Sequence, residues 1–323
     1  MKKILLLFLT LFLLFFASCT TGSNTNSDYL PSFNGGDTAL SFDFGENTPP
    51  DTVRDQSLQP FSVRISVQNQ GETDIAENSG YVVLTGFNPS ELNLNQTSKP
   101  LNALRGNHKQ GDNVISGGQQ QVIFDNLKYT SDIFSGSLPL TIYANICYPY
   151  KTRSVALLCI NGDTTPSIDD RTKICDLEGE RPFANSGAPV KIDNVKQYSG
   201  GTSKIQFQFD IVHVPSSDNA ILVESGSIDS RCKVNGKDPS SSEVLTSVDK
   251  VRYNVSTGIP GLSCSDSQSG NGEATLYGGD PITVTCIQDT TDQPEYEKAV
   301  SIQLEYDYID RVGKTITIQH IDQ

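Results

Sequence analysis

Cysteine is the residue type whose number and spacing most directly indicate chemistry in this chain. Apart from Cys19, the cysteines form an even set, which in an exported protein is typical of disulfides. That set comprises Cys147, Cys159, Cys175, Cys232, Cys264 and Cys286. Spacing alone leaves the connectivity open. Because the first two flank a predicted hairpin and the last two a predicted strand pair, the simplest complete pairing adds a Cys175–Cys232 bridge between the sequence halves. No Cys-x-x-Cys pair is present, so a zinc site is the weaker interpretation.

The histidines and carboxylates give little indication of a catalytic or metal-binding site. His108, His213 and His320 are scattered, and no nucleophile elbow, zinc-binding helix or phosphate-binding loop accompanies them. We therefore expect surface histidines and a protein that is not an enzyme and holds no metal or cofactor. The acidic stretch that contains Asp163, Asp169 and Asp170 could suggest a calcium site, but it lacks the regular acidic spacing of a calcium-binding loop. We therefore interpret this stretch as a solvated linker.

Tyrosines stand at alternate positions in two places, Tyr148 with Tyr150 and Tyr306 with Tyr308. Alternate residues of a strand share one face. The rings either stack against a sugar or protein partner, or continue an apolar stripe into the core with their hydroxyls bonded to backbone or water. The stripe is continuous and tryptophan is absent, which favours the core reading.

The N-terminal segment predicts export. Lys2 and Lys3 precede an apolar run over 4–16, interrupted only by Thr10, and Ala17-Ser18 lead directly into Cys19. The run is shorter than the ~20 residues that a membrane-spanning helix needs. The small pair before cysteine resembles a lipoprotein signal, in which Cys19 is lipidated and becomes the first residue of the mature chain; an ordinary signal peptide is the alternative. A diacylated cysteine holds a protein to a membrane without further help.

Composition excludes some partners. A formal net charge of −14 disfavours nucleic acid and anionic headgroups. Abundant Gly, Pro, Ser, Thr and Asn, with few helix-favouring runs, indicate a turn-rich β protein.

Alternating strands recur in the same order in both halves of the chain. Residues 61–67 match 205–211, the Gly-Gly pair before Val122 and Phe124 matches the pair before Ile282 and Val284, and 142–160 matches 300–318. In the last block we expect a hairpin with its turn around 151–153. Tyr148, Tyr150 and Arg153 align in one register with identical residues, which indicates duplication rather than shared strand bias.

Further segments carry a resemblance to a known family: 80–87, 147–150 with 159–160, 187–190 and 304–308. With these, the chain resembles an uncharacterised family of exported two-domain archaeal proteins with tandem immunoglobulin-like, adhesion-type domains. The resemblance implies structure but no activity. Asn185-Ser186, where a more glycine-rich turn is expected, departs from it.

The predicted fold is therefore all-β: two tandem immunoglobulin-like β-sandwiches after a lipoprotein-type signal and a flexible tether. The expected parts are a signal peptide over 1–18, the lipidated cysteine and tether over 19–36, domain 1 over 37–162, a linker over 163–187 and domain 2 over 188–323.

The predicted function is that of a lipid-anchored structural, adhesion or partner-binding protein outside the cytoplasm, at the cell surface or in the periplasm. Its expected partners are the membrane, through the anchor, and an envelope or surface protein. The alternatives are an extracytoplasmic enzyme or substrate-binding accessory with its site between the domains, and an assembly subunit that completes neighbouring sheets. Asn95 and Asn254 begin N-glycosylation sequons.

Overall fold

The computed structural model describes residues 30–321 except 112, 164–172, 234–237, 240–247 and 266. Within this part the protein is all-β, apart from one five-residue helix and a short 3-10 turn. The lipidation candidate Cys19, the signal peptide, and Asp169 and Asp170 of the acidic stretch lie outside the described residues.

The elements follow in chain order. The first part of the chain contains β1 (Leu40–Phe44), β2 (Thr52–Arg54), β3 (Phe61–Asn69), β4 (Tyr81–Thr85), β5 (Ser98–Pro100), β6 (His108–Gln110), β7 (Asn113–Ile115), β8 (Gln119–Leu127) and β9 (Ser137–Ile160). The second part contains β10 (Gly179–Glu180), β11 (Phe183–Asn185), β12 (Val190–Ser199), β13 (Lys204–His213), β14 (Ile221–Val223), α2 (Ile228–Cys232), β15 (Lys250–Ser256), β16 (Leu262–Cys264), β17 (Asn271–Thr275), the 3-10 turn η4 (Tyr277–Gly279), β18 (Ile282–Asp289) and β19 (Tyr296–Gln319).

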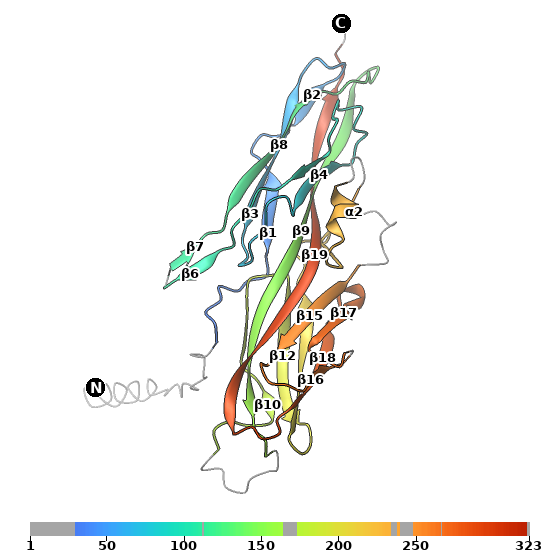
Figure 1. The fold of residues 1–323 in the computed structure, drawn as a ribbon. Coiled ribbons are helices and arrows are strands. Elements are labelled where there is room, and N and C mark those ends of the chain that lie inside the picture. Colours follow the sequence, from blue (N-terminus) through green and yellow to red (C-terminus); the bar gives the residue numbers. More distant parts are fainter. Residues whose placement is uncertain are drawn as a thin grey trace, which may run out of the picture.

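Two strands of 24 residues each, β9 and β19, form the axis of the molecule. They pair antiparallel along their whole length, from Ser137↔Gln319 to Ile160↔Tyr296. Figure 1 shows both running from one end of the elongated fold to the other. At ~3.3 Å per residue, each strand spans about 80 Å. We call this pair the spine.

The predicted hairpin turn at 151–153 is therefore wrong, because these residues continue β9. Thr152 is buried in phase with Tyr150, while Lys151 forms an ion pair with Glu305 of the paired strand at 2.7 Å. Charged residues on the wet face of a strand keep the alternation intact. The lysine and arginine that resembled a turn are the outward-facing half of that alternation.

The spine belongs to a nine-stranded sheet of order β17-β15-β19-β9-β4-β5, which β11, β14 and β2 join from the side. Two further sheets form its partners, β1-β3-β8 toward the end that carries β2, and β10-β12-β13-β18-β16 toward the other (Figure 1). We call these ends lobe 1 and lobe 2. Strands such as β3 bury every second residue, and one continuous apolar core contains residues from both lobes. The chain is thus an all-β protein of several antiparallel sheets; its assignment as tandem immunoglobulin-like domains stays an interpretation.

The sequence repeat has a geometric counterpart in the spine. Tyr148 pairs with Tyr308 and Tyr150 with Tyr306, so the repeated segments are related by a local twofold axis at the Pro149↔Asp307 pair. Each repeated strand therefore contributes one half to lobe 1 and the other half to lobe 2. The boundaries 37–162 and 188–323 stay predictions, but the two sequence halves share the spine throughout.

One detail of the expected repeat changes. Ile65 pairs with Val122 in lobe 1, and its counterpart Phe209 pairs with Val284 in lobe 2. The structural equivalent of Val122 is thus Val284, two positions beyond the residue that sequence alignment favoured. The expected linker also has some order, because β10 and β11 form within it.

Candidate functional site

Three disulfides join the six cysteines of the predicted set, with pairs Cys147–Cys232, Cys159–Cys175 and Cys264–Cys286. The expected 264–286 pairing is confirmed. The pairing of Cys147 with Cys159 is wrong, since the two residues lie on one extended strand, and the bridge between the sequence halves uses Cys147 and Cys232 instead of 175 and 232. Three disulfides in one chain indicate an oxidising, extracytoplasmic location.

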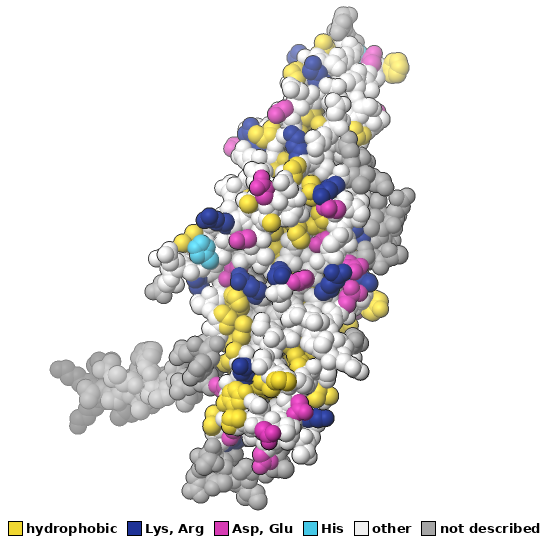
Figure 2. Space-filling view, in the orientation of Figure 1, with side chains coloured by type: hydrophobic (Ala, Val, Ile, Leu, Met, Phe, Trp, Pro, Cys, Tyr) yellow, Lys and Arg dark blue, Asp and Glu magenta, His cyan; other side chains and the backbone are white. Residues whose placement is uncertain are grey.

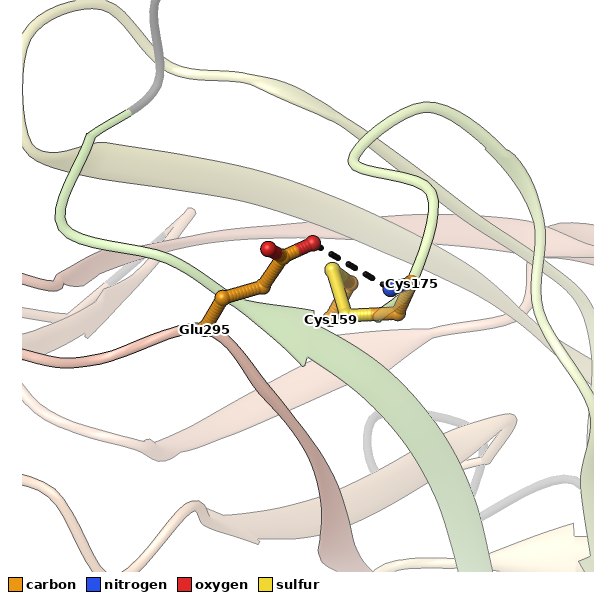
Figure 3. Close-up of side chains that lie close together, drawn as sticks. All are labelled: Cys159, Cys175 and Glu295. Atoms are coloured by element: carbon orange, nitrogen blue, oxygen red, sulfur yellow. Dashed lines mark hydrogen bonds between the residues drawn. A yellow bond between two sulfur atoms is a disulfide. The ribbon is translucent and has the colours of Figure 1, made fainter. Parts of the chain in front are cut away.

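Cys159, Cys175 and Glu295 lie together and have the residue types of a metal site (Figure 3). Their bonding argues otherwise. Both sulfurs are in the disulfide, and Glu295 Oε1 accepts hydrogen bonds from the backbone N–H groups of Ile174, at 3.0 Å, and Cys175, at 3.2 Å. A disulfide sulfur is not a thiolate ligand, so this cluster is a structural clamp at the far end of β9.

Four tyrosines, Tyr148, Tyr150, Tyr306 and Tyr308, fill the junction between the lobes, and we call them the tyrosine quartet. All four are buried, and the opposing rings lie 5.7 Å (Tyr148–Tyr308) and 6.1 Å (Tyr150–Tyr306) apart between centroids. These are the distances of packed aromatic pairs. The quartet is therefore core, which agrees with the continuous stripe in the sequence and removes the rings from any sugar-binding surface.

The hydroxyls of the quartet are bonded inside the protein. Tyr150 donates to the carbonyl of Gly187 at 2.8 Å, and Tyr308 Oη lies 3.1 Å from Nε2 of His213. Burial raises the pKa of Tyr150 to about 12 and that of Tyr308 above its ordinary value. The phenols of Tyr150 and Tyr308 are thus neutral at physiological pH and form hydrogen bonds within the protein.

The same junction is closed at its surface by Glu72. Its carboxylate accepts hydrogen bonds from the backbone N–H groups of Asn34 (2.9 Å), Gly35 (3.2 Å) and Gly187 (2.7 Å). Its backbone carbonyl accepts one from the guanidinium of Arg153 at 3.1 Å. One side chain thus ties the end of the expected tether and the end of the expected linker to lobe 1. The space between the lobes, where an enzyme or accessory site was the alternative, is packed along these described residues.

The three predicted surface histidines differ in setting. His108 is exposed on β6, as expected. His213 is half-buried against Tyr308, and burial lowers its pKa. His320 is wrong as a surface histidine, because its side chain is only 12% exposed and its Nδ1 lies 2.7 Å from Oδ2 of Asp55 and 3.4 Å from Oδ1 of Asp132. Sequence reasoning missed this cluster because Asp55 and His320 stand at opposite ends of the chain.

A groove of about 720 Å³ lies beside the Cys264–Cys286 disulfide in lobe 2. It is lined by Ser263, Cys264, Ser265, Ser267, Gln268, Thr285 and Ile287. None of these lining side chains is an acid or base that titrates near neutrality, because the cysteine is oxidised. Its described lining residues therefore offer hydrogen-bonding groups but no general acid or base.

The outer side of β8 is an open sheet edge of lobe 1. Within the described residues β8 pairs only with β3, whereas its lobe 2 counterpart β18 is covered by β16. The carbonyl of Ile123 accepts from Nζ of Lys99 at 2.7 Å, so it points away from β3. Since backbone groups alternate sides along a strand, Gln121 presents its N–H to the same open edge.

The surface carries no concentrated charge on the face drawn in Figure 2, where acidic, basic and hydrophobic side chains are interspersed along both lobes. Asn95 and Asn254, the two sequon residues, are both exposed, and the amide of Asn254 donates to the side chain of Asn271. None of the helices among the described residues is long and apolar enough to span a bilayer.

Comparisons with known proteins do not assign the chain to a family. No family model matches the chain, and no curated protein matches it. Among solved structures, the secreted serine protease VesC from Vibrio cholerae aligns with a TM-score of 0.17 and 11% identity, covering 88% of this chain and 52% of that one. CfaE, the adhesive subunit of the CFA/I fimbria of enterotoxigenic Escherichia coli, aligns with a TM-score of 0.11 and 13% identity over 91% of each chain.

These likenesses are too weak to carry function. The chain spans about half the length of VesC, and both TM-scores lie far below those of proteins that share a fold. The resemblance to exported two-domain archaeal proteins stays a prediction. The class that the structure itself defines is a disulfide-stapled, elongated, all-β extracytoplasmic protein.

Proposed function

We propose that this protein is a lipid-anchored structural, adhesion or partner-binding protein that acts outside the cytoplasmic membrane without catalysis. The observation that carries the proposal is the spine. Two strands paired over 24 residues pass through both lobes, so the lobes hold a constant relative orientation. Such a body suits a role in which a contact must be presented at a set distance from an anchor.

The anchor in this proposal is Cys19, lipidated after removal of residues 1–18. The disulfides support the exported location, and Cys19 is the single cysteine that is left over from them. A diacylated N-terminal cysteine would leave the described fold soluble and held at the membrane surface.

The contact that we propose is the open edge of β8, with an extended strand of an envelope or surface protein as its occupant. The edge offers outward backbone groups in a nine-residue strand, and the corresponding edge of lobe 2 shows what fills such a position, namely the short strand β16. Strand addition of this kind obtains affinity from main-chain hydrogen bonds. The alternative, a catalytic or substrate-binding site between the lobes, is disfavoured by the tyrosine quartet that occupies that position.

Crosslinking on intact cells followed by mass spectrometry tests the proposal. The variant that tests the β8 edge most directly is Gln121→Pro, because it removes a backbone N–H that points away from β3. Proline is tolerated on an edge strand where its missing N–H would face solvent. Gln121→Ala keeps the N–H and is the matched control. We expect crosslinks from wild type and Gln121→Ala to one surface partner, and their loss in Gln121→Pro with unchanged circular dichroism.

Two outcomes would overturn the proposal. Equal crosslinking by Gln121→Pro would show that the β8 edge is not the contact. Turnover of a substrate by the purified protein in a broad hydrolase screen would show that catalysis is part of its role. The same mass spectra report whether Cys19 carries acyl chains.

A further inference from the structure

Three segments that are distant in sequence meet at the lobe 1 end of the spine. The strand β2 pairs in parallel with the last residues of β19, and the backbone N–H of Asp55 donates to the carbonyl of Gln319 at 3.1 Å. The loop after β8 closes over them, since the N–H of His320 donates to Gly136 at 3.0 Å. This packing brings Asp55, Asp132 and His320 together. The strand β2, which ends one residue before Asp55, is labelled near the C-terminus in Figure 1.

The three side chains present ligand atoms at metal-binding spacing. One carboxylate oxygen or ring nitrogen from each lies within 4.8 Å of the other two. Nδ1 of His320 is 2.7 Å from Asp55 and 3.4 Å from Asp132. Ligands at ~2.0–2.2 Å from one tetrahedral Zn²⁺ lie about 3.3–3.6 Å from each other. Sub-ångström to ångström-scale side-chain shifts are enough to reach that arrangement.

A second observation points to a missing ligand. Asp55 is fully buried, and its Oδ1 has no hydrogen-bond partner among the described residues. Its Oδ2 receives His320 and the N–H of Ile133 at 3.4 Å, and the backbone N–H of Ile321 also faces this carboxylate. A buried carboxylate oxygen without a partner is costly. An ion bound at this carboxylate would remove that cost.

We propose that Asp55, Asp132 and His320 bind one divalent transition-metal cation of the Zn²⁺ class. Imidazole favours such ions over Ca²⁺ or Mg²⁺, and the carboxylates supply the compensating charge. Asp55 and His320 form the buried part of the site, and Asp132, 53% exposed, completes it from the surface. The cation takes the place of the proton on Nδ1 of His320: in a neutral ring that proton moves to Nε2, and in a protonated ring, which already carries a proton on Nε2, the Nδ1 proton is released to solvent.

Asp132 connects the site to solvent, from which a fourth ligand would come. Asp132 Oδ1 also accepts the backbone N–H of Phe134 at 2.8 Å, which orients the carboxylate, and Phe134 itself is 89% exposed beside it. The site thus reaches the surface at the lobe 1 end of the spine, where an ion from solvent can enter it. This inference does not depend on the proposed strand-addition contact, which lies on a different element.

Calorimetric titration of the untagged mature protein with ZnCl₂ at pH 7.5 tests the site. We expect one bound ion per chain, reversal by EDTA, a higher midpoint of thermal unfolding with zinc, and weaker binding at pH 5, where protons compete with zinc for the ligand atoms. Asp132→Asn and His320→Gln should each weaken binding roughly tenfold or more. His108→Gln, which removes an exposed histidine on β6, is the matched control and should bind as wild type does.

The competing explanation is a purely structural ion triad in which protonated His320 lies between two carboxylates. It predicts that Asp132→Asn lowers thermal stability but that zinc neither binds the wild type nor stabilises it. Affinity weaker than about 1 mM, or equal affinity in wild type and Asp132→Asn, would overturn the metal site. Because Asp132 is at the surface, its variant should fold, and circular dichroism checks that it does.

Discussion

Removing the Cys147–Cys232 disulfide is the perturbation whose effect follows most directly from the structure. Cys147 lies in β9 and Cys232 in α2, both are fully buried, and 85 residues separate them. In the chain-entropy relation, closing a loop of that length stabilises the folded protein by about 4.5 kcal/mol. The Cys159–Cys175 disulfide closes only 16 residues and should contribute about 3 kcal/mol.

The difference between the contributions of the two disulfides is a more reliable quantity than either contribution alone. The constant part of the relation cancels, and the difference in loop length alone amounts to about 1.5 kcal/mol. Loss of packing widens this gap, because the 147–232 sulfurs belong to a small apolar cluster that joins α2 to the spine. The double variant Cys147→Ala/Cys232→Ala should therefore be the less stable by at least that difference.

Urea unfolding followed by far-ultraviolet circular dichroism measures both double variants against wild type, and non-reducing peptide mapping verifies the two remaining bridges in each. Equal losses of unfolding free energy, or a larger loss for Cys159→Ala/Cys175→Ala, would refute the reasoning. The first result would mean that the unfolded chain is already constrained between the halves. The second would mean that the clamp at the end of β9 matters more than loop closure.

Three further predictions follow. Burial against Tyr308 lowers the folded-state pKa of His213, so the unfolded chain takes up a proton at this residue more readily and the protein loses stability as the pH falls below about 6.5. His213→Gln should make this loss of stability on acidification smaller. An unchanged pH profile of the unfolding midpoint would contradict the prediction. Gly71→Ala should cost ~1–3 kcal/mol, because a Cβ there meets Tyr150 Oη at 1.9 Å, and Tyr150→Phe in the same protein should recover part; additive losses in urea unfolding would argue against this overlap. The two sequence halves, expressed separately, should each lack cooperative unfolding because each lobe needs half of the other's long strand; two sharp independent melting transitions would disprove this.

Much of the secondary structure was predictable from local alternation. The strand from Phe61 to Asn69 buries every second side chain as its sequence predicts, and the identical tyrosines of the repeat occupy equivalent positions across the spine. An even set of cysteines predicted disulfides, which the structure confirms. These features depend on side-chain type at neighbouring positions, and neighbouring positions are what a single sequence displays.

The connectivity was not predictable in the same way. Lys151 and Arg153 favour a turn by their sequence, because charged residues interrupt the apolar pattern both in a turn and on the wet face of a strand. Only the pairing with β19 distinguishes the two cases. The same continuity placed Cys147 and Cys159 far apart along one strand, so neither could bond the other.

The sequence by itself determined an exported, acidic, β-rich chain with two related halves and thiols able to pair. Only the tertiary structure decided that the halves share one spine, that Cys147 reaches Cys232, and that Asp55 meets His320 across almost the whole chain. The physical reason is that alternation specifies which face of a strand is buried, whereas the choice of a strand's partner depends on backbone hydrogen bonds and packing between segments that the sequence keeps far apart.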